Sequence, residues 1–173
     1  MKSPRTQLLC TLMLVFTIGL SAFTCFDQPV SFEGTWVLDI TKSELGNTPV
    51  PKTGRSIIRV IQQQPLLIME KSLEDSAGKV QSKIDTISFD GKAMKINVGN
   101  GQIIERLITQ QWSADQQVMT LASKYTTDNN GEPIEFIGSE IWSLANSGKI
   151  LIIVNETVLP DRTEKIKLVY IKQ

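Results

Sequence analysis

Short stretches that alternate apolar and polar residues fill most of this chain, and a glycine-bearing turn separates most of them. Such alternation is the pattern of β-strands with one buried face, because successive side chains point to opposite sides of a sheet. Asp90-Gly91 and Asn100-Gly101 are turns of the type that connects adjacent antiparallel strands. Asn130-Gly131 and Ser147-Gly148 mark two further reversals. The chain therefore predicts a series of β-hairpins and no long helix.

This pattern predicts an all-β fold, an antiparallel up-and-down meander. A long meander either closes or leaves edges that promote aggregation, so closure into a barrel of about eight to ten strands is favoured. A two-sheet sandwich is the main alternative. One helical turn is expected at 40–45, and the strand at 93–98 is expected to pair with its predecessor across Asp90-Gly91. The expected strands are 32–38, 56–63, 66–73, 79–89, 93–98, 103–112, 118–126, 134–144, 150–158 and 164–171.

The first residues have the composition of a secretory signal peptide. Lys2 and Arg5 form a positive region, an apolar stretch follows at 8–22, and small residues near Ala22 suit a cleavage site. We therefore expect 1–24 to be a signal peptide, with export to the periplasm, the cell envelope or the extracellular space. The alternative is a retained membrane helix, although the apolar stretch is shorter than the roughly 20 residues of a typical spanning helix.

Cysteine usage bears on how the exported chain is anchored. Cys10 lies within the expected leader, so Cys25 is the single cysteine of the expected mature chain and has no partner for an intramolecular disulfide. Cys25 stands where a bacterial lipoprotein carries its acylated N-terminal cysteine, and a lipid there would tether the domain to a membrane through 25–31. Residues 22–24 match a lipobox poorly, so simple cleavage near Ala22 is the alternative.

The charge balance and the absence of histidine argue against several function classes. The chain has 18 Lys plus Arg and 18 Asp plus Glu, which argues against nucleic acid or an anionic surface as the main partner. Without histidine it lacks the commonest general base and the commonest metal and haem ligand. It contains no Gly-x-Ser-x-Gly elbow, phosphate loop or dinucleotide fingerprint. We therefore expect a protein that is not an enzyme and that uses no metal or cofactor.

The first folded stretch is Phe32-Glu33-Gly34-Thr35-Trp36-Val37-Leu38. Its glycine lets the backbone enter a sheet at a tight angle, and its tryptophan is large enough to plug one barrel end. With the leader, the hairpins, Lys42-Ser43 and a Trp-Ser pair before a Gly-Lys turn within 142–149, this stretch resembles the small secreted lipocalin-like domains of bacteria, in the calycin superfamily. The resemblance implies a lipocalin-like β-barrel domain over 32–173.

Two features depart from that superfamily. Lipocalins carry an arginine near the last strand that stacks on the indole of the Gly-x-Trp motif, and only Arg162 is available here, just before that strand. Fatty-acid-binding proteins grip a carboxylate with an Arg-x-Tyr pair in the final strand, whereas this chain has Lys167-Leu168-Val169-Tyr170 there. That carboxylate grip therefore does not transfer to this chain.

If the tryptophan-bearing strand faces point inward, two charged residues lie inside an apolar barrel. Arg106 shares such a face of its strand, and Phe136, Glu140 and Trp142 share the corresponding face of theirs. Arg106 is then an anchor for a ligand carboxylate or phosphate, with Glu140 as a second polar group. Phe136 and Trp142 supply aromatic walls.

The opposite strand faces are nearly as apolar, through Ile103, Leu107, Ile137 and Ile141. The alternative is therefore that Arg106 and Glu140 lie outside the barrel, or pair with each other as a structural ion pair.

The leading functional hypothesis is a non-catalytic barrel that binds a small apolar or amphipathic molecule in the cell envelope or outside the cell, with Trp36 as a core plug. The alternative is an accessory or interaction module whose barrel is filled by side chains and has no small-molecule ligand. A lipocalin-like enzyme is a third hypothesis, weakened because the usual bases are missing. An open cavity of a few hundred Å³ would favour the first.

Overall fold

The computed structural model describes residues 28–46, 54–97, 103–129, 132–159 and 161–173. The expected signal peptide, Cys25 and the turns at Asn100-Gly101 and Asn130-Gly131 lie outside these residues. The described part forms ten strands and one short 3-10 helix, η1. In chain order these are β1 (Gly34–Leu38), η1 (Ile40–Lys42), β2 (Gly54–Gln63), β3 (Leu66–Asp75), β4 (Val80–Ser88), β5 (Met94–Asn97), β6 (Ile103–Trp112), β7 (Val118–Asn129), β8 (Glu132–Ala145), β9 (Ile150–Val158) and β10 (Thr163–Lys172).

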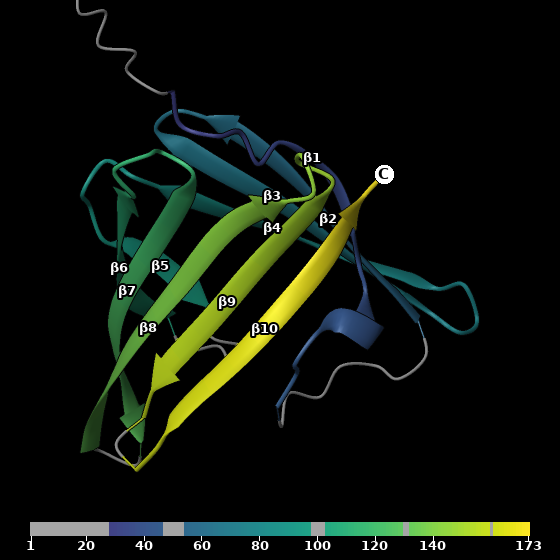
Figure 1. Cartoon of the computed structure of the whole chain (residues 1–173). Helices are drawn as coiled ribbons and strands as arrows, with labels where there is room; N and C mark the ends of the chain where they lie inside the picture. Colours follow the sequence, from purple (N-terminus) through teal and green to yellow (C-terminus); the bar gives the residue numbers. More distant parts are fainter. Residues whose placement is uncertain (1–27, 47–53, 98–102, 130–131, 160) are drawn as a thin grey trace, which may run out of the picture.

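All ten strands belong to one antiparallel sheet, in the order β4-β3-β2-β1-β10-β9-β8-β7-β6-β5. Because β1 pairs with both β2 and β10, the first and last strands are joined and the sheet curls into a nearly closed barrel. Figure 1 shows β8, β9 and β10 side by side as the near wall, with β2, β3 and β4 behind them. The predicted fold class, an all-β up-and-down barrel, is confirmed.

The barrel is open between β4 and β5, where the predicted hairpin is wrong. β4 pairs with β3 and β5 pairs with β6, so the two edges of the sheet belong to consecutive strands. Gly91 has a φ of 78°, but Asp90 is not among the residues with positive φ, so the turn differs from the expected type. Phe89 explains the departure, because its side chain packs against the core and its N–H donates to the Pro65 carbonyl at 2.9 Å. The chain is thereby held against the β2–β3 turn instead of folding back along β4.

Aromatic side chains fill one end of the barrel. Phe32, Trp36 and Trp142 are fully buried there. The Phe32 ring stacks on Trp112 with 5.9 Å between centroids and meets Trp142 edge-on at 5.6 Å. The Trp36 indole N–H donates to the Phe32 carbonyl at 3.0 Å, so this buried donor has a hydrogen-bond partner. Trp36 is thus a core plug, as the sequence predicts.

The cation above the Trp36 ring comes from Lys172 and not from Arg162. The Lys172 ammonium lies 5.1 Å from the ring centroid. Its position follows from strand pairing, since Trp36 and Lys172 are register partners in β1 and β10. Arg162 lies before β10 and pairs with Asp161 and Glu164 at 3.0 and 2.8 Å.

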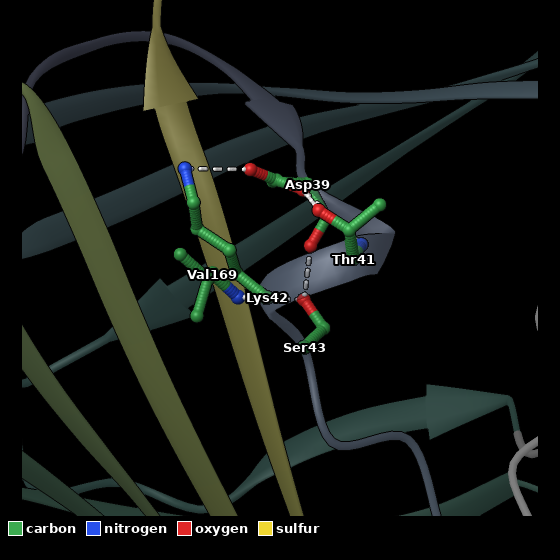
Figure 2. A network of polar contacts seen from close by, with 5 residues as sticks. All are labelled: Asp39, Thr41, Lys42, Ser43 and Val169. Carbon is green, nitrogen blue, oxygen red and sulfur yellow. Dashed lines mark hydrogen bonds and ion pairs between the residues drawn. The ribbon is translucent and has the colours of Figure 1, made fainter.

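After β1 the chain leaves the barrel wall for the single turn of η1 and then rejoins β10. The Glu44 and Lys167 backbones exchange hydrogen bonds of 2.8 Å in both directions. Between these bonds and β1, the Ser43 hydroxyl accepts from the Val169 N–H at 3.0 Å and donates to the Asp39 carbonyl at 2.8 Å, as Figure 2 shows. A side chain therefore bridges the gap in the ladder that η1 creates.

Candidate functional site

The tryptophan-bearing faces of β6 and β8 point into the barrel. Ile104, on the same face as Arg106, is buried, whereas Ile103 on the opposite face is 67% exposed. On β8, Trp142 is fully buried and shares its face with Glu140. Arg106 and Glu140 therefore lie on the inner side of the barrel wall, and the alternative that places both outside is wrong.

Away from its filled end, the barrel encloses open space. Two cavities of about 330 and 420 Å³ lie there, and Ile96, Arg106 and Glu140 line both of them. Because the cavities share these residues, they meet around Arg106. Each volume is near the lower end of the range for small-molecule sites, about 300–1,000 Å³. Other polar lining residues are Ser123, Tyr125, Ser139, Asn155, Glu156, Thr157 and Glu164 in the smaller cavity and Lys71, Lys83, Asp85, Thr86 and Lys95 in the larger.

Arg106 has no polar partner in the described part of the chain. Its Nε is buried without a hydrogen-bond acceptor, and no ion pair of the described residues includes its guanidinium. Glu140 instead accepts the Trp142 indole N–H at 3.1 Å, so the expected alternative of an Arg106–Glu140 ion pair is not formed. A guanidinium is always charged, and leaving its donors buried and unpaired is unfavourable. The Arg106 side chain lines both cavities, where water or a ligand can supply an acceptor to its guanidinium.

Asn155 is a second inward polar residue with an unused hydrogen-bonding atom. It lies opposite Glu140 in the β8–β9 register, and its Oδ1 is buried without a donor. The smaller cavity thus offers a cationic donor at Arg106, a carboxylate at Glu140 and a neutral acceptor at Asn155. This combination suits a ligand that carries both acceptor and donor groups at one end.

Gly138 keeps the wall of the smaller cavity clear. It pairs with Ser123 on β7 and Thr157 on β9. A Cβ atom at Gly138 would come within 3.1 Å of the Ser123 hydroxyl oxygen, which is closer than ordinary van der Waals contact. A larger residue would therefore push Ser123 aside and reduce the open space.

The two predicted aromatic walls occupy different places. Phe136 stacks on Tyr125, with 5.0 Å between ring centroids, and Tyr125 lines the smaller cavity. Trp142 is buried in the filled end and reaches the site through its hydrogen bond to Glu140. Neither Phe136 nor Trp142 lines the two cavities around Arg106. Phe136 instead packs behind Tyr125, and Trp142 orients the Glu140 carboxylate.

A charged triad lines the larger cavity beside the open edge of β4. Asp85 accepts ion pairs from Lys71 at 2.8 Å and from Lys83 at 2.9 Å. Partial burial alone would raise the pKa of Asp85, but the hydrogen bonds from both lysines outweigh it and hold the pKa below its usual value. With two lysines to one carboxylate, the triad adds positive charge to the side of the barrel that faces Arg106.

Sequence reasoning found Arg106 and Glu140 but missed Asn155 and the Lys71–Asp85–Lys83 triad. Asn155 was detectable, because it continues the inward alternation of Leu151 and Ile153 on the same strand. The triad was not predictable from the sequence, because its residues lie on two strands whose charges are typical of a solvent-exposed hairpin.

Among the described residues there is no group of three or more metal-ligating side chains. Within the same residues, no helix has the length and apolar character that crossing a membrane requires. The sequence matches no family model and no curated protein.

Proposed function

We propose that this chain is an exported, non-catalytic, lipocalin-like domain of the calycin type, which binds a small amphipathic molecule with an anionic group. The observation that carries the proposal is the guanidinium of Arg106, which has no acceptor among the described residues and belongs to a side chain that lines both cavities. A ligand carboxylate or phosphate supplies that acceptor through a charge-assisted hydrogen bond. Asn155 Oδ1 and the Glu140 carboxylate accept hydrogen bonds, so a second group at that end of the ligand, a hydroxyl or an amine, donates to them.

The apolar part of the ligand has a surface to pack against. The larger cavity is lined by Met69, Ile87, Met94, Ile96 and Ile108, next to the charges of the Lys71–Asp85–Lys83 triad. Its volume of about 420 Å³ favours a small ligand over a long-chain lipid. An amphipathic molecule matches this mixture of apolar lining and one unpaired cation better than a purely apolar one.

The test compares ligands that differ only in their head group, using displacement of a fluorescent naphthalene sulfonate probe. We expect a medium-chain carboxylate to bind the wild type more tightly than the matching alcohol. Arg106→Met should weaken carboxylate binding by roughly 10- to 100-fold, because a charge-assisted hydrogen bond contributes about 1.5–3 kcal/mol. Binding of the alcohol should change little.

Arg59→Met is the matched control, because Arg59 is an exposed arginine that pairs with Glu70 at 3.3 Å. Its affinity should equal that of the wild type. If Arg106→Met and Arg59→Met bind the carboxylate equally well, or if neither head group binds the wild type, the proposal is wrong.

The filled end of the barrel favours a second candidate, an accessory or interaction module without a small-molecule ligand. One end of the interior is closed by Phe32, Trp36, Trp112 and Trp142, as in a barrel that serves only as a scaffold. Native mass spectrometry separates the two candidates. Persistent absence of any co-purifying small molecule, together with failure to bind either head group, would support the second.

Export and anchoring rest on the composition of the leader. A signal peptide over 1–24 would release the barrel outside the cytoplasm, and acylation of Cys25 would tether it to a membrane. Fractionation of cells that express the wild type or Cys25→Ala tests the tether. Loss of the membrane-bound fraction in Cys25→Ala supports acylation, whereas unchanged fractionation contradicts it.

A further inference from the structure

The first half of β4 forms part of an arm that projects beyond the barrel. Residues 80–84 are exposed on both faces of the sheet, and Val80 and Ile84 are 57% and 65% exposed. Figure 1 shows the β3–β4 hairpin as the teal turn that reaches out on the right of the molecule. None of these five residues is buried in the core, although Lys83 and Ile84 line the larger cavity, so the exposed apolar surface of Val80 and Ile84 does not serve core packing.

The outer edge of the same arm has no neighbour in the described sheet. β4 pairs with β3 on one side, and β5 does not pair with it on the other. Alternate backbone N–H and C=O groups along such an edge point to solvent, where they are ready to bind another strand. Towards the other end of β4, the Ser88 N–H donates to the Met94 Sδ at 3.3 Å, so the unpaired edge lies before Ser88.

We infer that this edge of β4 pairs with the same edge of a second copy, antiparallel and centred on Ile84. A two-fold axis at one residue places that residue opposite its own copy, and its two neighbours opposite each other. Lys83 then lies opposite the partner's Asp85, and Asp85 lies opposite the partner's Lys83. The two exposed Ile84 side chains meet at the axis on the outer face.

The charges on β4 select this register over its neighbours. Centred on Lys83, the edges would place two lysines opposite each other, and centred on Asp85 they would place two carboxylates together. Like charges directly opposite are unfavourable, whereas opposite charges and apolar pairs are favourable. A register centred on Ser82 would put Lys83 opposite the neutral Gln81, Val80 opposite Ile84, and Lys79, which precedes β4, opposite Asp85. Only the register at Ile84 gives both charged residues of β4, Lys83 and Asp85, partners of opposite charge within the strand.

The ion pairs within one chain are compatible with this pairing. Asp85 is held from inside by Lys71 at 2.8 Å, so it stays charged and positioned at the edge. The Lys83 side chain is 73% exposed and bonds the other oxygen of Asp85 at 2.9 Å. Lys83 can therefore reach the partner's Asp85 at little cost, because its own Asp85 keeps Lys71.

Sedimentation velocity of the purified chain over a wide range of concentration tests the dimer. The wild type should approach twice the mass of one chain. Lys83→Asp places carboxylates opposite each other, and Asp85→Lys places lysines opposite each other, so each should raise the dissociation constant of the dimer by roughly tenfold or more. Mixed in equal amounts, the two variants should associate again, because every pair across the axis is once more Lys with Asp.

Ile84→Asp is a second variant, exposed enough to leave folding intact, and should also give a single-chain mass. Lys165→Asp makes the same charge change far from the edge and should leave the dimer unchanged. All variants keep the same N-terminal segment, so association through that segment would affect them equally. Far-UV circular dichroism confirms that each is folded. A wild type that stays at single-chain mass, a dimer that folded Lys83→Asp and Ile84→Asp leave intact, or folded charge variants that do not associate when mixed would each overturn the inference.

Discussion

Trp36 is held by three different contacts, and only one of them was readable from the sequence. Its burial as a barrel plug followed from the Gly-x-Trp stretch. Its hydrogen bond to the Phe32 carbonyl and its cationic neighbour Lys172 depend on how β1 meets β10. Arg162 was the only arginine available near the final strand, and its position before that strand already departed from the lipocalin pattern. Register, which places Lys172 beside Trp36, is a property of the paired strands and not of either stretch alone.

Tyr170 gives a pH-dependent prediction for a single side chain. Burial, with a smaller effect of the Glu140 carboxylate, raises its pKa from 10.0 to about 12. The folded state thus holds the phenol proton more tightly than the unfolded state. The resulting stability is fully present below pH 10 and is lost as pH rises through about 12. Between pH 10 and pH 12 we expect the free energy of unfolding of the wild type to fall by on the order of 2 kcal/mol more than that of Tyr170→Phe.

Absorbance titration of phenolate formation, with Tyr170→Phe subtracted, isolates this group. The difference curve should rise near pH 12, and Glu140→Gln should shift it downward. A difference curve centred at the ordinary value of a tyrosine would contradict the buried, carboxylate-facing environment of Tyr170.

The segment between β1 and β2 contains η1 and keeps the chain attached to β10 where the pairing of β1 with β10 is interrupted. η1 interrupts the pairing of β1 with β10, and the Ser43 hydroxyl takes the place of the missing backbone acceptor for Val169. The Asp39 carboxylate fixes the turn by accepting from the Thr41 hydroxyl at 2.6 Å and from Lys42 at 3.0 Å (Figure 2). The hydrogen bond from Thr41, followed by that from Lys42, lowers the pKa of Asp39, so the contribution of Asp39 to stability is present above its ordinary pKa and is lost at lower pH.

Ser43→Ala removes the side-chain bridge and leaves the Val169 N–H without an acceptor. Val169 is buried, so the loss should cost about 1–3 kcal/mol of unfolding free energy, measured by urea denaturation. Thr41→Ala is the control, because Thr41 is exposed and bonds only within the turn; its change should stay within about 0.5 kcal/mol. Equal stability of Ser43→Ala and the wild type would show that the attachment of this segment to β10 does not depend on the Ser43 hydroxyl.

At the same scale, the strands themselves were the most predictable part of the fold. Alternation and glycine-bearing turns placed all ten, and 103–112 and 150–158 agree with β6 and β9 to the residue. The separation of β4 from β5 was not predictable from Asp90-Gly91, because the local turn signal there favours a hairpin. What separates these strands is the packing of Phe89 on the core and its bond to Pro65, which are contacts distant in the chain.

The whole molecule divides into a filled end and a hollow end, and the sequence could not show where one passes into the other. Both faces of β6 and β8 carry isoleucines, so hydrophobicity alone left the direction of Arg106 undecided. The structure decides it because Trp112 and Trp142 fit only on the side where Phe32 closes the barrel. Once the tryptophans face inward, the strict alternation of each strand carries Arg106 and Glu140 into the same interior.

This division predicts opposite effects of two substitutions on the inner face of one strand, β9. Leu151 is fully buried in the filled end, so Leu151→Ala should destabilise the fold by about 2–5 kcal/mol. Asn155 lies four residues on, in the hollow end, with a buried Oδ1 that lacks a donor. Asn155→Val removes that unsatisfied atom and should leave stability unchanged or raise it by about 1 kcal/mol. Ligand affinity should show the opposite pattern: Asn155→Val should lower it, and Leu151→Ala should leave it unchanged.

Urea denaturation and displacement of the fluorescent probe measure the two quantities on the same proteins. Asn155→Val should weaken binding of a carboxylate ligand that also carries a hydroxyl group, the donor that Oδ1 lacks, while folding at least as stably as the wild type. Leu151→Ala should bind normally at urea-free, low-temperature conditions where it is still folded. Loss of stability in Asn155→Val without loss of affinity would mean that the hollow end is structural. In a ligand site inside a barrel, we expect polar groups that lower the stability of the empty protein and strengthen ligand binding. Their unpaired atoms find hydrogen-bond partners only when the ligand is present.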